Sequence, residues 1–273
     1  MNQLLSLCVL GTFCLSAQIL PAQTSKQAVT IGQTYELTSQ YTDFAYDVSV
    51  YLPDNYEERK DTLDYPCLYL FIGGEDLFHC ATGVTRLLAR HREIPEMIVV
   101  GVTNIRWWPD LTPEKVEWRE DAGEGKDFLA FVSNQLIPFV DKNFSTNDHS
   151  LYMGHSLGGL FGVYTLTESH NLFDDYILIS PSVQDRANSL FGQLEETLAN
   201  EKEMNNDVYF TMGSEGNRIS KGSHKIATAF SGYEGKNLKW RLEVMPDKNH
   251  FTTMIPTMVN GLKYVTANEM EKD

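Results

Sequence analysis

The sequence is poor in basic side chains. Its 273 residues include 22 lysines and arginines against 37 aspartates and glutamates, so the formal net charge is −15 at pH 7. A surface of this charge repels phosphate backbones and anionic lipid, and we therefore expect neither nucleic acid nor a membrane surface as a partner. The charge does not indicate which substrate the protein takes.

Cysteines and metal-binding patterns are also scarce. Of four cysteines, Cys67 and Cys80 lie outside the N-terminal leader. Cys67 begins an apparent strand and Cys80 lies well past its other end; because strand residues advance ~3.3 Å each, a disulfide is out of reach unless the chain doubles back. We expect two buried free thiols. The sequence has no HExxH motif and no Cys/His pairs at ligand spacing, so we expect no metal and no organic cofactor.

The longest uncharged stretch is at the N-terminus. Residues 1–22, MNQLLSLCVLGTFCLSAQILPA, carry no charged side chain, and their apolar run is too short to span a bilayer. We interpret residues 1–22 as a signal peptide cleaved near Ala22 or Ala17, although the segment before the apolar run has no Lys or Arg. The alternative is a buried N-terminal helix. A signal peptide implies a periplasmic or secreted protein without membrane insertion.

No repeat, low-complexity segment or Pro/Ser linker divides residues 23–273, which we expect to form a single domain. Alternating apolar and polar residues predict half-exposed strands at 34–39, 46–53 and 238–245. Continuous apolar runs predict parallel strands buried on both faces at 67–72, 97–102, 150–154, 175–180 and 207–212. Apolar residues at helical spacing predict helices at roughly 83–92, 126–142, 157–168, 187–202, 221–232 and 253–268.

This order of elements predicts the fold class. Alternating strands and helices from residue 67 onward indicate a doubly wound α/β fold, with a mostly parallel eight-stranded sheet and an antiparallel N-terminal edge. In such sheets ligands bind at the carboxyl ends of the strands. We therefore look for functional residues directly after strands.

One such position carries a G-x-S-x-G motif. Gly154, Ser156 and Gly158 follow the run SLYM and precede the apolar helix LFGVYTL. A nucleophile elbow needs this pattern, because the serine sits in strained backbone and only glycine fits the close packing two residues either side. A phosphate-binding turn would favour G-x-G-x-x-G instead, and a plain turn is the other alternative. We predict Ser156 as a catalytic nucleophile.

A serine nucleophile needs a base, and the base needs an orienting acid. In this architecture both follow the serine in the chain. His250 lies between the last strand and the C-terminal helix and is the predicted base. Glu215 directly follows the strand DVYFTM and is the predicted acid, with Asp247 as its rival. An ordinary exposed role for Glu215 is the alternative.

Stabilising the oxyanion takes two backbone amides. The first is that of Leu157, at the start of the helix after the elbow. The second comes from LFIGGEDLF, where Gly74 is favoured and the neighbouring Glu75 amide would serve equally well.

With these residues in place, the chain resembles the putative-esterase (esterase D-like) family of α/β-hydrolases. Besides the elbow, the resemblance covers roughly residues 45–267 and is carried by CLYLFIGGEDLF, IVVGVTNIRWWPDLTP, QLIPFVDKNF, FDDYILISPSV and NHFTTMIPTMVNGLKYV. It implies an α/β-hydrolase fold with Ser156 as nucleophile, His250 as base and an acid near Glu215. The family includes siderophore (enterobactin-type), feruloyl and acetyl-xylan esterases and mycolyltransferases. Where members often have Asp-Gly in the oxyanion loop, this chain has Ile72-Gly73-Gly74.

The resemblance also implies that the loop NIRWWPDLTP lies beside the active site. Trp107 and Trp108 would then form an aromatic wall for a ring or a sugar, or else cover the core. Arg106 could bind an anionic ester, or it could form a structural clasp with Asp110.

We therefore expect an exported serine esterase acting on a small-molecule or carbohydrate-linked ester, through an acyl-enzyme on Ser156. Two alternatives stay open: an acyltransferase with the same triad, and a non-catalytic binding module with a hydrolase fold. The ester and the oligomeric state are not indicated by the sequence.

Overall fold

The computed structural model describes residues 28–183, 188–233, 235 and 237–270. The predicted signal peptide, residues 1–22, lies outside the described residues. The helices and strands below all belong to one compact unit, Ile31–Asp273.

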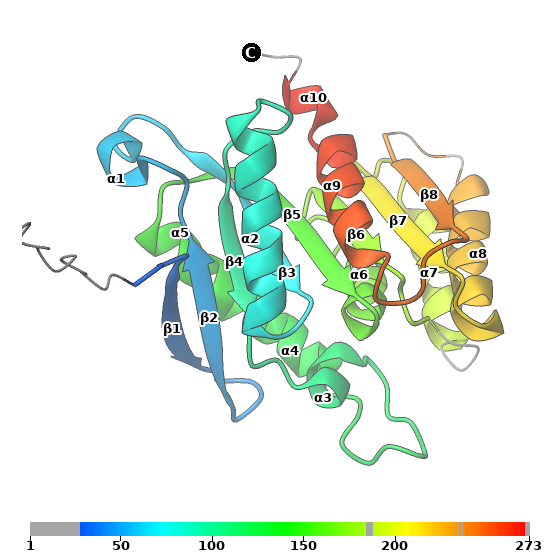
Figure 1. Cartoon of the computed structure of the whole chain (residues 1–273). Coiled ribbons are helices and arrows are strands. Elements are labelled where there is room, and N and C mark those ends of the chain that lie inside the picture. The colour runs from blue at the N-terminus through cyan, green and yellow to red at the C-terminus, as the bar shows by residue number, and fades with distance from the viewer. Residues whose placement is uncertain (1–27, 184–187, 234, 236, 271–273) are drawn as a thin grey trace, which may run out of the picture. The chain divides into compact units, whose positions relative to one another are not determined.

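In the described residues, eight strands form one sheet in the order β1-β2-β4-β3-β5-β6-β7-β8 (Figure 1). β1 pairs antiparallel with β2 and β2 pairs antiparallel with β4, whereas the remaining neighbours are parallel. The predicted mostly parallel sheet with an antiparallel N-terminal edge is confirmed. The strands are β1 (Gln33–Thr38), β2 (Ala45–Tyr51), β3 (Tyr65–Phe71), β4 (Ile98–Val102), β5 (Thr146–His155), β6 (Asp175–Ile179), β7 (Asp207–Gly213) and β8 (Lys239–Met245).

Helices cover both faces of this sheet. α2 and α9 pack against each other on one face, in front of the sheet in Figure 1, and α6 packs on β5 and β6 from the other. β3, β4 and β6 are buried along their whole length because helices cover both of their faces, whereas the edge strands β1 and β8 are partly exposed. The helices are α1 (Tyr56–Arg59), α2 (Glu75–Arg90), α3 (Trp107–Leu111), α4 (Gly125–Phe131), the π-helical turn η1 (Val132–Leu136), α5 (Ile137–Asn143), α6 (Leu157–Glu168), α7 (Asn188–Asn200), α8 (Asn217–Ser231), α9 (Met254–Val265) and α10 (Ala267–Met270).

Some sequence predictions about the helices and thiols need correction. α2 begins at Glu75, not near residue 83. Gly74, at φ 72°, ends the preceding loop, and acidic residues in the first turn favour a helix start there. The loop predicted after β4 contains the short helix α3. Both cysteines are free, as predicted, but only Cys67 is buried; Cys80 is exposed on α2.

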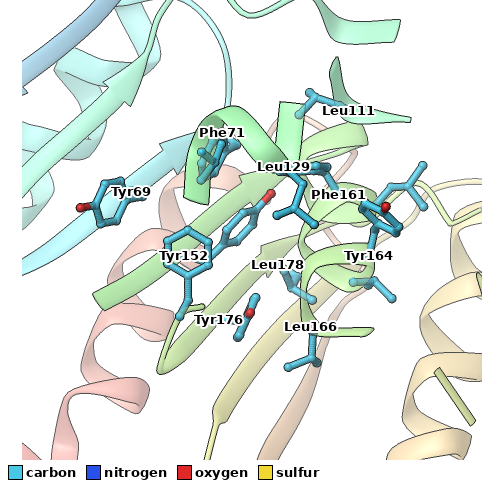
Figure 2. Close-up of a cluster of buried hydrophobic side chains, with 14 of the residues drawn as sticks. Tyr69, Phe71, Leu111, Leu129, Tyr152, Phe161, Tyr164, Leu166, Tyr176 and Leu178 are labelled. Carbon is cyan, nitrogen blue, oxygen red and sulfur yellow. The ribbon is translucent and has the colours of Figure 1, made fainter. Parts of the chain in front are cut away.

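A cluster of buried aromatic side chains packs against the turn between β5 and α6. The rings of Phe71 on β3 and Tyr152 on β5 stack with centroids 4.8 Å apart, and Phe161 on α6 packs beside both (Figure 2). The buried Tyr152 hydroxyl donates a hydrogen bond to the Gly158 carbonyl oxygen. The core therefore holds the first turn of α6 against the end of β5.

The glycines of the elbow are required by close backbone contacts. A Cβ on Gly158 would overlap the Phe71 carbonyl oxygen, and one on Gly154 would overlap the Gly158 carbonyl oxygen. Neither obstacle is a flexible side chain, so an added methyl group must displace β3, β5 or α6.

We predict that Gly158→Ala lowers the free energy of unfolding by about 3 kcal/mol or more, because backbone overlap cannot be relieved by a change of rotamer. Urea unfolding would measure the effect. Gly83→Ala is the matched control: an added Cβ there meets nothing within 4 Å, and on the exposed side of α2 it should stabilise by about 1 kcal/mol. Equal stability of the Gly158→Ala and wild-type proteins would contradict the close contact.

Candidate active site

Ser156 lies between β5 and α6 with backbone angles of φ 56° and ψ −112°. A non-glycine residue with positive φ is strained, and such strain is typical of a nucleophile elbow. Backbone hydrogen bonds hold this conformation: the Ser156 amide donates to Ile179 and the Ser156 carbonyl accepts from Leu160 and Ser182. The strained turn presents the serine at the carboxyl edge of the sheet, next to the N-terminus of α6.

The serine hydroxyl has a partner that the sequence analysis missed. Ser156 Oγ lies 3.1 Å from Ser182 Oγ, in the loop after β6. Among the hydrogen bonds of the described residues, this is the one that the Ser156 side chain makes. Either hydroxyl can be the donor in this contact.

His250 and Glu215 form a hydrogen-bonded pair after the last two strands. His250 Nδ1 is 3.1 Å from Glu215 Oε2, and the Glu215 side chain is 2% exposed. Glu215 Oε1 also accepts from Ser180 Oγ and from the Gly213 amide. Burial alone would raise the pKa of Glu215, but the hydrogen bonds from His250, Ser180 and Gly213 outweigh it and hold the pKa below its ordinary value. Glu215 is thus kept as a carboxylate facing the imidazole.

Asp247, the rival acid, lies elsewhere. Its side chain is 74% exposed and pairs with Lys248 at 3.0 Å. The geometry favours Glu215 as the group that orients His250.

The helices α2 and α6 follow the neighbouring parallel strands β3 and β5, so their N-termini lie at the same edge of the sheet. Leu157 is the first residue of α6, so its amide is not used within the helix. In the other loop, the Gly74 amide donates to the Thr103 carbonyl oxygen at 3.2 Å. Because the favoured Gly74 amide is engaged, we take the alternative, the amide of Glu75 at the start of α2, as the second candidate donor.

The two tryptophans lie in different surroundings. The Trp107 indole covers Gly73, where an added Cβ would lie 2.5 Å from the ring. Trp108 is partly buried, meets Trp118 edge-on at 4.8 Å and carries the Arg119 guanidinium over its ring. Trp107 therefore borders the loop of Gly73 and Gly74, and Trp108 lines a cavity.

That cavity, of about 330 Å³, adjoins the serine. Its wall combines Leu157 from the elbow and Ser182, the partner of Ser156, with a segment between α3 and α4. The lining residues are Trp108, Thr112, Pro113, Glu114, Lys115, Val116, Glu117, Trp118, Leu157, Leu160, Ser182 and Leu190. Its two largest side chains are tryptophans, and three leucines lie beside the charged Glu114, Lys115 and Glu117. The tryptophans and leucines suit a ligand with an apolar or aromatic group.

Arg106 does not line this cavity. Its guanidinium is 2.6 Å from the fully buried Asp110, 3.0 Å from Glu124 and 3.3 Å from the Tyr46 hydroxyl. Burial raises the pKa of Asp110 despite these bonds, so the arginine is needed to balance that carboxylate. The arrangement is the structural clasp left open by the sequence, and Arg106 is not among the residues that line this cavity.

The structure thus brings Ser156, His250 and Glu215 to one edge of the sheet. Sequence reasoning missed the side chains around them, namely His155, Ser180, Ser182 and Thr253. Ser180 and Ser182 come directly after β6, so the search for functional residues after strands could have found them. Within the described ranges, His, Cys, Asp and Glu side chains do not form a cluster suited to a metal ion. None of the helices described is both long and apolar enough to cross a bilayer.

The sequence is similar to known esterases. It is 28% identical over 141 residues to the ferri-bacillibactin esterase BesA of Bacillus subtilis, covering 44% of this chain and 48% of BesA. It is 28% identical over 166 residues to the siderophore enterobactin esterase of Emericella nidulans, covering 52% and 54%. The alignments thus span about half the length of these curated relatives.

The fold is also shared with solved structures. An IroE-like serine hydrolase from Shewanella oneidensis superimposes with a TM-score of 0.80 at 20% identity, covering 87% of this chain and 80% of that one. This likeness shows the α/β-hydrolase fold predicted from the sequence. The family described as "Putative esterase" matches residues 39–251, and the family expected from the sequence motifs is thereby confirmed. The chain belongs to the Putative esterase family.

Proposed function

We propose that the protein is a serine esterase, exported through its N-terminal segment, that hydrolyses a small-molecule ester. The observation that carries the proposal is the meeting of a strained serine at a helix N-terminus with a hydrogen-bonded His250–Glu215 pair at the same sheet edge. A serine between a strand and a helix needs no histidine for folding, whereas an acyl-transfer site needs the serine, the histidine and the acid.

In the proposed reaction Ser156 Oγ attacks the ester carbonyl carbon while His250 Nε2 takes the hydroxyl proton. Glu215 accepts from Nδ1 and stabilises the imidazolium that forms. The amides of Leu157 and Glu75 stabilise the oxyanion. His250 then protonates the leaving alcohol, and water deprotonated by His250 hydrolyses the acyl-enzyme, which restores the free serine.

The cavity beside Ser156 supports a substrate class. Trp108, Trp118 and Leu160 give its wall an apolar, aromatic character, while the chain's charge disfavours polyanions. With relatives named as siderophore esterases, we take an ester with an aromatic group as the substrate to test first. Acyl transfer to an alcohol other than water would use the same residues.

The proposal is tested by labelling the mature protein with a fluorophosphonate and locating the adduct by mass spectrometry, beside turnover of p-nitrophenyl acetate and methyl ferulate. We expect one adduct, on the peptide containing Ser156, and none after heat denaturation. The Ser182→Ala variant is the matched control and should still be labelled at Ser156. A folded wild-type protein that is neither labelled nor active would indicate a binding module instead.

A further inference from the structure

His155, the second residue of the G-x-S-x-G motif, is a buried polar residue that the proposed reaction does not use. It ends β5 and is 4% exposed. Side chains alternate along a strand, so His155 shares a face with Leu151 and Met153, whose cluster includes residues of α2 and α9. The chain enters α9 from the loop that carries His250, and the elbow is thereby brought under that loop.

In the described part of the chain, the hydrogen bond and ring contacts of the His155 imidazole are made with that loop. Its Nε2 is 2.9 Å from the His250 carbonyl oxygen, its ring centroid is 4.6 Å from that of His250, and the Phe251 ring lies 6.0 Å away. A carbonyl oxygen can only accept, so the Nε2 atom must carry the proton. Burial lowers the pKa of His155 to about 4, outweighing the hydrogen bond to the His250 carbonyl oxygen and the nearby Glu215 carboxylate, which both raise it. The residue is therefore neutral, with its proton on Nε2.

Among the described residues, the His250 carbonyl oxygen has two possible donors, and only one of them is unshared. The His250 carbonyl also lies 3.2 Å from Thr253 Oγ1, but Thr253 Oγ1 is 3.1 Å from Ser180 Oγ as well. Ser180 has a single hydroxyl proton, which it gives to Glu215. The Thr253 proton is thus shared between two acceptors. The His155 Nε2–H serves the His250 carbonyl alone.

We propose that His155 is a positioning residue, which fixes the backbone of His250 through this hydrogen bond and so holds the imidazole between Glu215 and Ser156. This inference deepens the proposed function and rests on it. Proton transfer depends strongly on the placement of the base, so a loose His250 lowers the rate of acylation more than it lowers substrate binding.

Two variants separate the hydrogen bond from the ring contact. His155→Phe keeps a ring against His250 but removes the donor, whereas His155→Gln keeps an amide N–H near the position of Nε2 but removes the ring. With p-nitrophenyl acetate, we expect kcat of His155→Phe to fall about 10- to 100-fold with KM changed less than about twofold. His155→Gln should recover most of kcat. The rate of fluorophosphonate labelling should follow the same order.

An unchanged kcat in His155→Phe, or equal losses in the Phe and Gln variants, would overturn the proposal. If neither variant folds, the proposal is tested by NMR on the wild-type protein. In ¹H–¹⁵N NMR of the histidine rings, assigned through contacts with Phe251, His155 should keep its Nε2–H from pH 5 to 8. A proton on Nδ1, or titration in that range, would overturn it.

The outcomes also separate this inference from the proposed function. An active, labelled wild type with an unaffected His155→Phe variant removes only the positioning role. A wild type that is neither active nor labelled removes the esterase and the positioning role together.

Discussion

Replacing Ser156 with alanine is expected to lower kcat for p-nitrophenyl acetate about 10⁴- to 10⁶-fold and to abolish fluorophosphonate labelling. The alanine has no atom that can form the acyl-enzyme, and water must then attack the ester directly. The residual rate would come from the oxyanion amides and substrate binding alone. Steady-state kinetics on freshly purified protein would measure this loss of kcat. An empty-vector control, taken through the same preparation, would exclude a contaminating esterase.

The fold of the Ser156→Ala variant should persist. Alanine has the same Cβ at φ 56°, so the strain of the turn is unchanged, and Ser182 loses one hydroxyl partner. We expect the unfolding free energy to change by about 1 kcal/mol or less. Activity retained in a correctly folded Ser156→Ala protein would refute the nucleophile, and loss of activity through unfolding would show up in the same urea curves.

Replacing Glu215 with glutamine is expected to lower kcat about 10²- to 10⁴-fold, with KM less affected. The neutral amide cannot stabilise the imidazolium of His250. If its oxygen keeps the hydrogen bonds from the Ser180 hydroxyl and the Gly213 amide, its NH₂ group takes the place of the oxygen that faces His250 Nδ1. Asp247→Asn is the matched control, because that carboxylate is exposed and pairs with Lys248; its kcat should stay within about twofold. The reverse outcome would make Asp247 the acid.

A comparison of the wild-type and Glu215→Gln proteins also tests the lowered pKa of Glu215. Because the folded pKa lies below the unfolded one, the carboxylate stabilises the fold fully above an unfolded value of about 4.3, and that stabilisation is lost as pH falls through the folded pKa. The stability difference between wild type and Glu215→Gln should therefore be larger at pH 7 than below about pH 4. A difference that grows on acidification would have the wrong sign for a hydrogen-bonded carboxylate.

Much of this site follows from local sequence. Residues 150–159 specify strand, strained turn and helix through neighbouring side chains, so the position of Ser156 after a strand was predictable. The positions of His250 and Glu215 at the same edge were predictable because parallel strands place their carboxyl ends together. Arg106 was not, because its role depends on Tyr46 and Glu124, which other parts of the chain bring to it.

The hydrogen bonds around these side chains could not be predicted from the sequence, for a related reason. Ser180 reaches Glu215, and His155 reaches the His250 carbonyl, only through the pairing of β5, β6 and β7 and the path of the loops that follow. The hydrogen bond of the Gly74 amide could not be predicted from the local sequence either. This amide is engaged by Thr103, a residue after the neighbouring strand β4, and no local pattern indicates that bond.

The wall of the cavity comes largely from the segment between α3 and α4, residues 112–118, whereas Ser156, His250 and Glu215 follow β5, β8 and β7. In the proposed esterase, selectivity and chemistry are thus encoded in separate stretches of the gene. Insertions, deletions or substitutions in the codons for 112–118 would alter which esters enter without altering the side chains proposed to cleave them. Such changes give related chains a route toward different esters with the proposed reaction kept.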